Sequence, residues 1–294
     1  MGSGECVKTI CVAGLNIRIV SGDTDFFDRR YRDYVCQDTE PDMYMETALL
    51  DEIPEPNGEP CSQIKASRIV KLSDGGFCRY IKSQKTGSIP YAIYYNSDYT
   101  KVRIELKKGM TYLNLGTTDW EYLYTGFMFA NRITYLGGTV LHSSAMAYKH
   151  NGIVFSADPG TGKSTHVSLW KKKFGDDVVI VNDDKPAVRF EGDKAYIYGT
   201  PWSGKTDLNV NVREPLKAIV FIERAEQNSI ERMSVSDSVL NLSRQLPNPF
   251  YDGEVGARTV EFIKKIYDRG IPVYRLKCNI SDEAVQTVYN EIIL

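Results

Sequence analysis

The first part of the chain carries short runs in which apolar and polar residues alternate, separated by turn residues. The first run covers residues 10–20, and a later stretch at 52–61 is rich in Pro, Gly and Glu and reads as a loop. Alternation of this kind between turn residues is typical of half-buried strands. Further runs occur at 67–72, 77–81, 91–95, 101–106 and 110–115. We therefore predict a β-rich N-terminal region over residues 1–116, with antiparallel pairing.

The pattern changes near residue 117, where apolar residues begin to recur at helical spacing. Leu123 and Phe127 mark one face of a predicted helix over 117–135, and two glycines come after it. Beyond this helix strands and helices alternate, which indicates an α/β domain over 117–294. The predicted strands are 140–148, 153–157, 178–181, a hairpin over 187–198, 218–223 and 273–277, and the predicted helices are 163–174, 235–245, 259–268 and 282–292.

Composition and charge are those of an ordinary globular protein. Of the 294 residues, 42% are hydrophobic and 25% charged, and the formal net charge is −2. Such a balance does not call for nucleic acid as a partner, and no apolar run is long enough to span a bilayer. The six cysteines include no C-x-x-C pair, which is typical of reduced thiols. We expect a cytoplasmic protein with no nucleic-acid or membrane partner.

Two segments resemble the phosphate-loop pattern G-x-x-x-x-G-K-[ST]. The second of them, residues 199–206 (the second loop), matches every letter, whereas residues 157–165 (the first loop) begin with Ala157 in place of Gly. Phosphate binding needs a buried strand, then a loop with inward-pointing amides, then the N-terminus of a helix. An apolar strand over 153–156 precedes the first loop and a helical pattern comes after it, so the first loop has this context.

The second loop lacks this context, because the residues after it alternate like a strand over 207–212. Pro201 and Trp202 would also crowd a phosphate. We interpret the second loop as either a surface turn or a substrate-side loop of the same site, in which Trp202 and Lys205 would face the substrate. The predicted nucleotide-binding residues all belong to the first loop: Asp158, Pro159, Gly160, Thr161, Gly162, Lys163, Ser164 and Thr165.

The first loop and the strand after it supply groups for phosphoryl transfer. Lys163 would reach the β- and γ-phosphates of ATP, and the Ser164 hydroxyl would hold Mg²⁺. The apolar strand from Val178 ends in Asp183-Asp184. One of these carboxylates can be the base for an acceptor hydroxyl while the other supports Mg²⁺. The alternative is that the second Asp only caps the turn.

These residues resemble the catalytic domain of the HPr kinase/phosphorylase family and its shorter relatives, some of which phosphorylate precursor peptides. The family pattern is a His, two strands, the phosphate loop, a helix, and a strand that ends in Asp-Asp. Here His142 stands fifteen residues before Ala157, and Asp183-Asp184 close the set. The resemblance covers residues 141–224 and extends weakly to the end of the chain.

The resemblance implies a phosphoenolpyruvate-carboxykinase-like phosphate-loop fold with a mixed sheet, and an ATP- and Mg²⁺-dependent kinase. It further implies that Asp183 is the base, that His142 lies close to the transferred phosphate, and that Asp184 supports Mg²⁺. The acceptor would be a hydroxyl of a peptide, a small protein or a metabolite. The full family enzyme is a hexamer, which leaves a homo-oligomer open here.

The chain also departs from the family pattern. Residues 194–199 (KAYIYG) stand where the full enzyme has a further acidic metal ligand, and the phosphorylase signature is not found. Kinase activity is therefore favoured over phosphorylase activity. Two alternatives stay open: a nucleotide-gated binding module that hydrolyses ATP slowly, and a carboxykinase-type reaction on a small acid.

Overall fold

The computed structural model describes residues 6–37, 39–64, 66–111, 114–204, 206–246 and 252–294. The chain divides into two compact units, Met1–Arg132 and Ile133–Leu294. Both are mixed α/β structures, each built on a sheet that contains parallel and antiparallel pairs.

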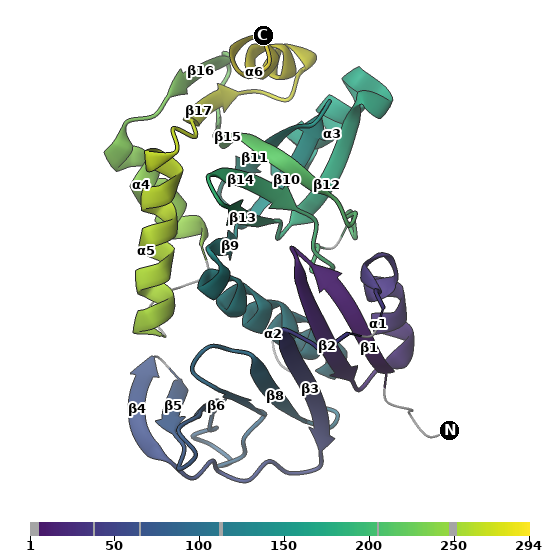
Figure 1. The fold of residues 1–294 in the computed structure, drawn as a ribbon, viewed down its shortest axis with the longest axis vertical. Coiled ribbons are helices and arrows are strands. Elements are labelled where there is room, and N and C mark those ends of the chain that lie inside the picture. The colour runs from purple at the N-terminus through teal and green to yellow at the C-terminus, as the bar shows by residue number, and fades with distance from the viewer. Residues whose placement is uncertain (1–5, 38, 65, 112–113, 205, 247–251) are drawn as a thin grey trace. The chain divides into compact units, whose positions relative to one another are not determined.

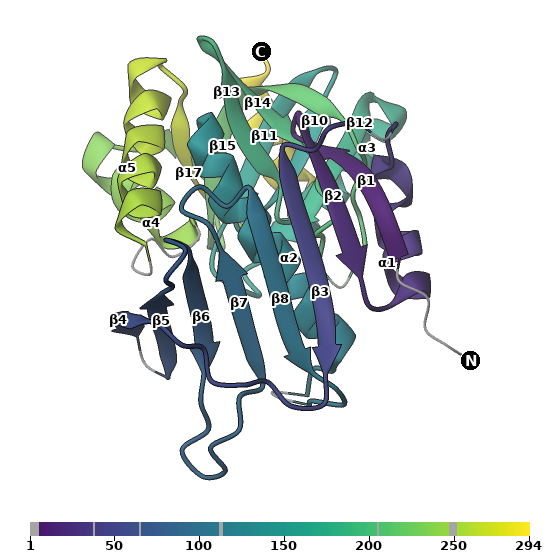
Figure 2. The ribbon, with the colours of Figure 1, turned by 60° about the horizontal axis from the view of Figure 1, so that its bottom comes forward.

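The first unit is built on one sheet, which Figure 2 shows from β4 at one edge to β1 at the other. In the described residues its strand order is β1-β2-β3-β8-β7-β6-β5-β4. All neighbours are antiparallel except β2–β3 and β3–β8, which are parallel. The bounds are β1 Cys6–Val12, β2 Leu15–Ser21, β3 Met43–Leu50, β4 Glu59–Ile64, β5 Ser67–Lys71, β6 Phe77–Ile81, β7 Tyr91–Tyr95 and β8 Lys101–Lys107.

The predicted runs over 67–106 pair antiparallel as expected, and both parallel pairs involve β3. Helix α1 (Thr24–Tyr31) lies between β2 and β3 in the chain, and its N-terminus is capped by Asp23, whose Oδ1 accepts the Phe26 amide at 3.1 Å. A crossover of this kind lets two successive strands run parallel. The sequence pattern also missed β3, and it assigned the start of β4 to a loop. The predicted strand at 110–115 falls partly outside the described residues.

Helix α2 (Thr117–Arg132) belongs to the first unit, where it packs against β8 and β3. It buries Tyr124, Met128 and Phe129 on one face. A short 3-10 helix, Ile133–Leu136, begins the second unit. The compact units thus divide after residue 132, whereas the predicted domain boundary was after residue 116, and the difference is this one helix.

The second unit is built on a larger mixed sheet with the order β12-β10-β11-β15-β14-β13-β9 in the described residues (Figure 1). Strand β17 extends it from β15 and pairs in turn with β16. The pairs β11–β15 and β15–β17 are parallel and the others antiparallel. The strands are β9 Gly138–Val140, β10 Ser143–Tyr148, β11 Asn151–Ser156, β12 Val178–Asp184, β13 Ala187–Glu191, β14 Lys194–Tyr198, β15 Arg213–Arg224, β16 Ser229–Arg232 and β17 Val273–Cys278.

Helices cover both faces of this sheet. Trp170 of α3 (Lys163–Phe174) and Val285 of α6 (Asp282–Ile292) pack into one apolar cluster, and Leu242 of α4 (Val235–Gln245) and Phe262 of α5 (Gly253–Asp268) pack into another. Strand β10 lies between the two clusters and is buried along its whole length. The middle of the sheet is therefore packed on both faces, and the loops at its strand ends start from buried strands.

Two predicted elements of the second unit have other bounds in the structure. The predicted strand over 140–148 is broken at Leu141-His142 into β9 and β10, and α5 begins at Gly253, before the predicted start at 259. No helix in the described parts of the chain has the length and apolar character needed to cross a bilayer.

Candidate functional site

The first loop joins the buried strand β11 to the N-terminus of α3. Gly160 and Gly162 have φ angles of 78° and 124°, which residues with a Cβ rarely adopt. A Cβ at either position would meet no heavy atom within 4 Å, so the backbone there borders open space. Gly162 is the N-cap of α3, and no side chain caps the helix. The first amides of α3 are thus left for an anion.

Lys163 is the first residue of α3, and its side chain is buried. Its ammonium group donates a hydrogen bond to the Ala157 carbonyl oxygen at 3.0 Å. Burial lowers the pKa of Lys163, while the nearby carboxylates of Asp184, Asp183 and Asp158 act in the opposite direction. The positive charge at this helix N-terminus is therefore close to the Asp pair, which comes from another strand.

The side chains of Asp183 and Asp184 both have partners at the end of β12. Asp183 is 6% exposed, and it accepts hydrogen bonds from the Ser144 hydroxyl and, at 2.8 Å, from the Thr206 hydroxyl. Asp184 has a φ of 150°, and its Oδ1 lies 3.4 Å from Nε2 of His142. Its other carboxylate oxygen pairs with Lys185. The two adjacent carboxylates at the end of β12 thus have separate sets of partners.

His142 lies in the break between β9 and β10. Its backbone amide donates to the Gln245 carbonyl oxygen at 3.0 Å, which ties this residue to the end of α4. Burial lowers the pKa of His142, and the charge of Lys163 lowers it further. The imidazole is therefore neutral near pH 7 and can donate one hydrogen bond and accept another.

The structure brings Lys163, Asp183, Asp184 and His142 together, while Ser164 and Thr165 lie exposed on the first turn of α3. Within the described residues there is no group of three or more His, Cys, Asp or Glu side chains that could hold a metal ion by itself. Mg²⁺ needs no such group, because it is commonly held by one or two carboxylates together with substrate phosphates. The oxygen donors of Ser164 and the Asp pair suit that ion.

The second loop packs against the same Asp pair and has no helix after it. The Gly204 amide donates to the Asp183 carbonyl oxygen at 3.0 Å, and the next residues return to the sheet through a bridge between Asn209 and Asn182. Trp202, predicted to face a substrate, is buried, and Lys205 lies outside the described residues. Through its bond to Asp183, the second loop lies at the border of the site.

Sequence patterns did not reveal three residues of this region: Ser144, Thr206 and Arg224. Arg224, at the end of β15, donates to the carbonyl oxygens of Thr161, at 3.1 Å, and Gly160. These bonds hold two carbonyl groups of the first loop toward β15. The only signal in the sequence was that Arg224 comes directly after an apolar strand, as site residues in α/β sheets often do.

The comparisons with solved structures include a weak similarity to a kinase structure. The structure of the Hpr(Ser) kinase/phosphatase from Coxiella burnetii aligns with 53% of this chain and 97% of its own, at 12% identity and a TM-score of 0.29. No protein-family model matches the chain, and no curated protein matches it. At that TM-score the similarity supports no conclusion about activity, so the function must be inferred from the geometry of the site.

Proposed function

We propose that this chain is an ATP- and Mg²⁺-dependent phosphotransferase that moves the γ-phosphate to a hydroxyl group of a peptide, a small protein or a metabolite. The observation that best supports it is the position of Lys163. This ammonium group stands at an uncapped helix N-terminus and close to both carboxylates of the Asp pair. A phosphate-binding cation beside two carboxylates is the arrangement that phosphoryl transfer requires.

The first loop would bind the phosphates. Its amides at the start of α3 would donate to phosphate oxygens, and Lys163 would exchange its bond to the Ala157 carbonyl for bonds to the β- and γ-phosphates. Ser164 and Asp184 would hold Mg²⁺, which when bound offsets the negative charge of the phosphates. Asp184 suits this role because its side chain is more exposed than the buried Asp183.

Asp183 would act on the acceptor. The Thr206 hydroxyl already donates to Asp183 at 2.8 Å, and this is the bond that an acceptor hydroxyl would make in its place. Asp183 would take the hydroxyl proton as the acceptor oxygen bonds to the γ-phosphorus and the bond to the ADP oxygen breaks. His142, neutral and beside Asp184, would donate a hydrogen bond to the transferred phosphate.

One observation favours a second candidate, a nucleotide-gated module that hydrolyses ATP slowly. Asp183 is 6% exposed and both of its carboxylate oxygens already accept hydroxyl hydrogen bonds. An acceptor could therefore reach it only if Thr206 moves. If that movement does not occur, water would be the only acceptor and the Asp pair would serve binding alone.

A single-turnover assay with γ-labelled ATP separates the two candidates. Serine-containing peptides and small polyols serve as acceptors, and Asp183→Asn is compared with the wild type. We expect label on an acceptor, a loss of at least about a hundredfold in transfer by the variant, and Mg²⁺-ATP affinity within a few fold of wild type. Label found only in inorganic phosphate, at equal rates in both proteins, would exclude the transferase.

A further inference from the structure

A cavity of about 470 Å³ opens beside the first loop, between α3 and the ends of β15 and β17. Gly162 and Thr165 line it, whereas Lys163 and the Asp pair do not. Its volume falls within the range of about 300–1,000 Å³ that is usual for small-molecule sites. The cavity therefore continues from the proposed phosphate site in a direction that the phosphoryl-transfer residues do not use.

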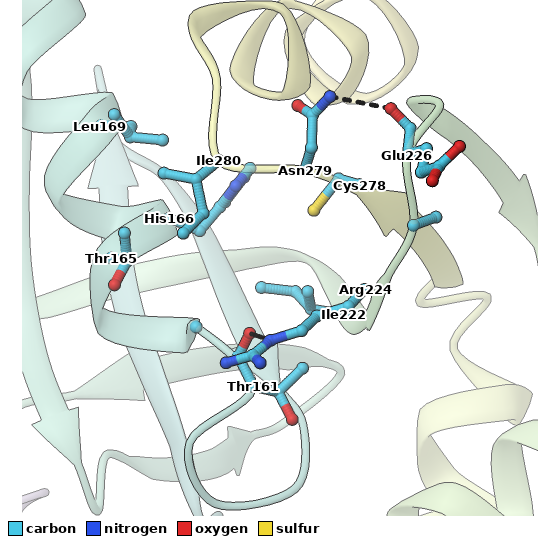
Figure 3. A pocket seen from close by; sticks show the side chains of 12 residues that line it. Thr161, Thr165, His166, Leu169, Ile222, Arg224, Glu226, Cys278, Asn279 and Ile280 are labelled. Atoms are coloured by element: carbon cyan, nitrogen blue, oxygen red, sulfur yellow. Dashed lines mark hydrogen bonds between the residues drawn. The ribbon is translucent and has the colours of Figure 1, made fainter.

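One wall of the cavity is a single face of α3. Gly162, Thr165, His166 and Leu169 stand at positions i, i+3, i+4 and i+7, which share one side of a helix. Figure 3 shows Leu169 and His166 on this wall, with Ile280 beside them. Ile280 is 73% exposed, which is high for a large apolar side chain that lines a cavity. A flat apolar ligand in the cavity would cover it.

His166 supplies a fixed hydrogen-bond donor in this wall. His166 is 4% exposed, so its ring is held inside this wall. The Trp170 indole N–H donates to His166 Nε2 at 3.2 Å, which places the remaining proton on Nδ1. Phe155 packs against the ring at 4.7 Å between centroids. Among the residues that the structure describes, none accepts a hydrogen bond from Nδ1.

We propose that this cavity binds the nucleoside part of the triphosphate, with the base packed between Leu169 and Ile280 and an acceptor atom of the nucleoside bonded to the N–H of His166. The inference rests on the proposed function for the phosphate end. Phosphates on the first amides of α3 would leave the nucleoside near Thr165, which lines the cavity. An apolar wall with one tautomer-fixed donor suits a heteroaromatic ring that carries nitrogen or oxygen acceptors.

The test compares Mg²⁺-ATP with Mg²⁺-tripolyphosphate, which has the phosphates without the nucleoside, by calorimetry. We expect the wild type to bind ATP at least about tenfold more tightly than tripolyphosphate. Ile280→Asp should remove most of that difference by lowering the affinity for ATP and not the affinity for tripolyphosphate. The matched control is Val260→Asp, a substitution of a 67% exposed residue on α5 that does not line the cavity. Val260→Asp should change neither the affinity for ATP nor the affinity for tripolyphosphate.

His166→Phe tests the donor, since it keeps an aromatic ring against Phe155 and removes the N–H. This variant should lower the affinity for ATP by about five- to tenfold and leave the affinity for tripolyphosphate unchanged. Because the variant also leaves the Trp170 N–H without its acceptor, Ile280→Asp is the variant that does not depend on core packing. Tripolyphosphate bound as tightly as ATP, or ATP affinity unchanged in both variants, would overturn the nucleoside site while leaving the phosphate site standing. If the wild type binds neither ligand, the proposed function fails and this inference fails with it.

Discussion

The second unit contains two loops that resemble the same phosphate-loop motif, and they differ in the element that each loop leads into. The first loop runs into α3, twelve residues long and without a side-chain cap. The second loop runs back to the sheet through the bridge between Asn209 and Asn182. The helix N-terminus, and not the letters of the motif, supplies the amides and the partial positive charge that bind a phosphate. The loop with the poorer match therefore has the structural context that phosphate binding needs.

The glycines of the two loops differ in the space around them. A Cβ on Gly162 would meet open space, whereas a Cβ on Gly199 would lie 1.7 Å from the Val210 carbonyl oxygen. The first glycine is needed for its φ of 124° and the second for close packing. One loop thus keeps room for a ligand, and the other uses its glycine to fit against its own backbone.

The largest expected effect separates the lysines of the two loops. Lys163→Ala should abolish turnover and weaken Mg²⁺-ATP binding by roughly ten- to a hundredfold, the effect of one lost charge-assisted contact of about 1.5–3 kcal/mol. Lys205→Ala should change the affinity by no more than about fivefold. Calorimetry and a turnover assay on both variants provide the measurement. The reverse ranking would show that the second loop binds the phosphates.

The next largest effects are expected from substitutions of Gly162 and Gly199, which should change ATP affinity and stability. Gly162→Ala should cost about 1–3 kcal/mol of backbone strain at its φ of 124°, so the Tm should fall, and ATP affinity should fall about tenfold or more because the loop leaves the binding conformation to relieve the strain. Gly199→Ala should lower the free energy of unfolding by about 1–3 kcal/mol or more, because the Val210 carbonyl must move, and should leave the conformation of the first loop unchanged.

The control for this pair is Gly192→Ala. Gly192 has a φ of 60°, lies in the turn between β13 and β14, and also has open space at its Cβ. It should cost stability through strain without any loss of ATP affinity. Equal losses of affinity in Gly162→Ala and Gly192→Ala would mean that the first loop has no special part in binding.

The smallest effect concerns the contact between the second loop and Asp183. Thr206→Val removes the hydroxyl that donates to Asp183 at 2.8 Å and should cost about 1 kcal/mol of stability. It should also lower the KM for the acceptor a few fold, because the acceptor hydroxyl no longer competes for Asp183. Thr206→Ser keeps the hydroxyl and should behave as wild type. A higher acceptor KM in Thr206→Val would indicate that Thr206 binds the acceptor directly.

The local parts of the site could be predicted from the sequence. Helices 163–174 and 235–245 are confirmed at both ends, and the strand before the first loop is present. Hydrophobic periodicity and glycine positions act over a few residues, so they carry this information. The same signals explain why the second loop could be set aside although its letters fit the motif.

The contacts that complete the site could not be predicted in this way. Ser144, Thr206 and Arg224 reach their partners across 39, 23 and up to 64 residues of the chain. The order of the strands in the sheet brings these residues together. The hydrophobic periodicity of a single segment carries no information about that order. The parallel pair of β3 with β8 was missed for the same reason, since these strands are far apart in the sequence, and the pair of β3 with β2 was missed because β3 itself was not predicted.

The most direct test is a crystal structure with Mg²⁺ and a non-hydrolysable ATP analogue. We predict phosphate oxygens at about 2.7–3.2 Å from the backbone nitrogens of residues 160–164, with Lys163 turned from the Ala157 carbonyl oxygen to the phosphates. Phosphates bound to the amides of residues 199–206, or to neither loop, would contradict the assignment of the phosphate site and the phosphotransferase with it.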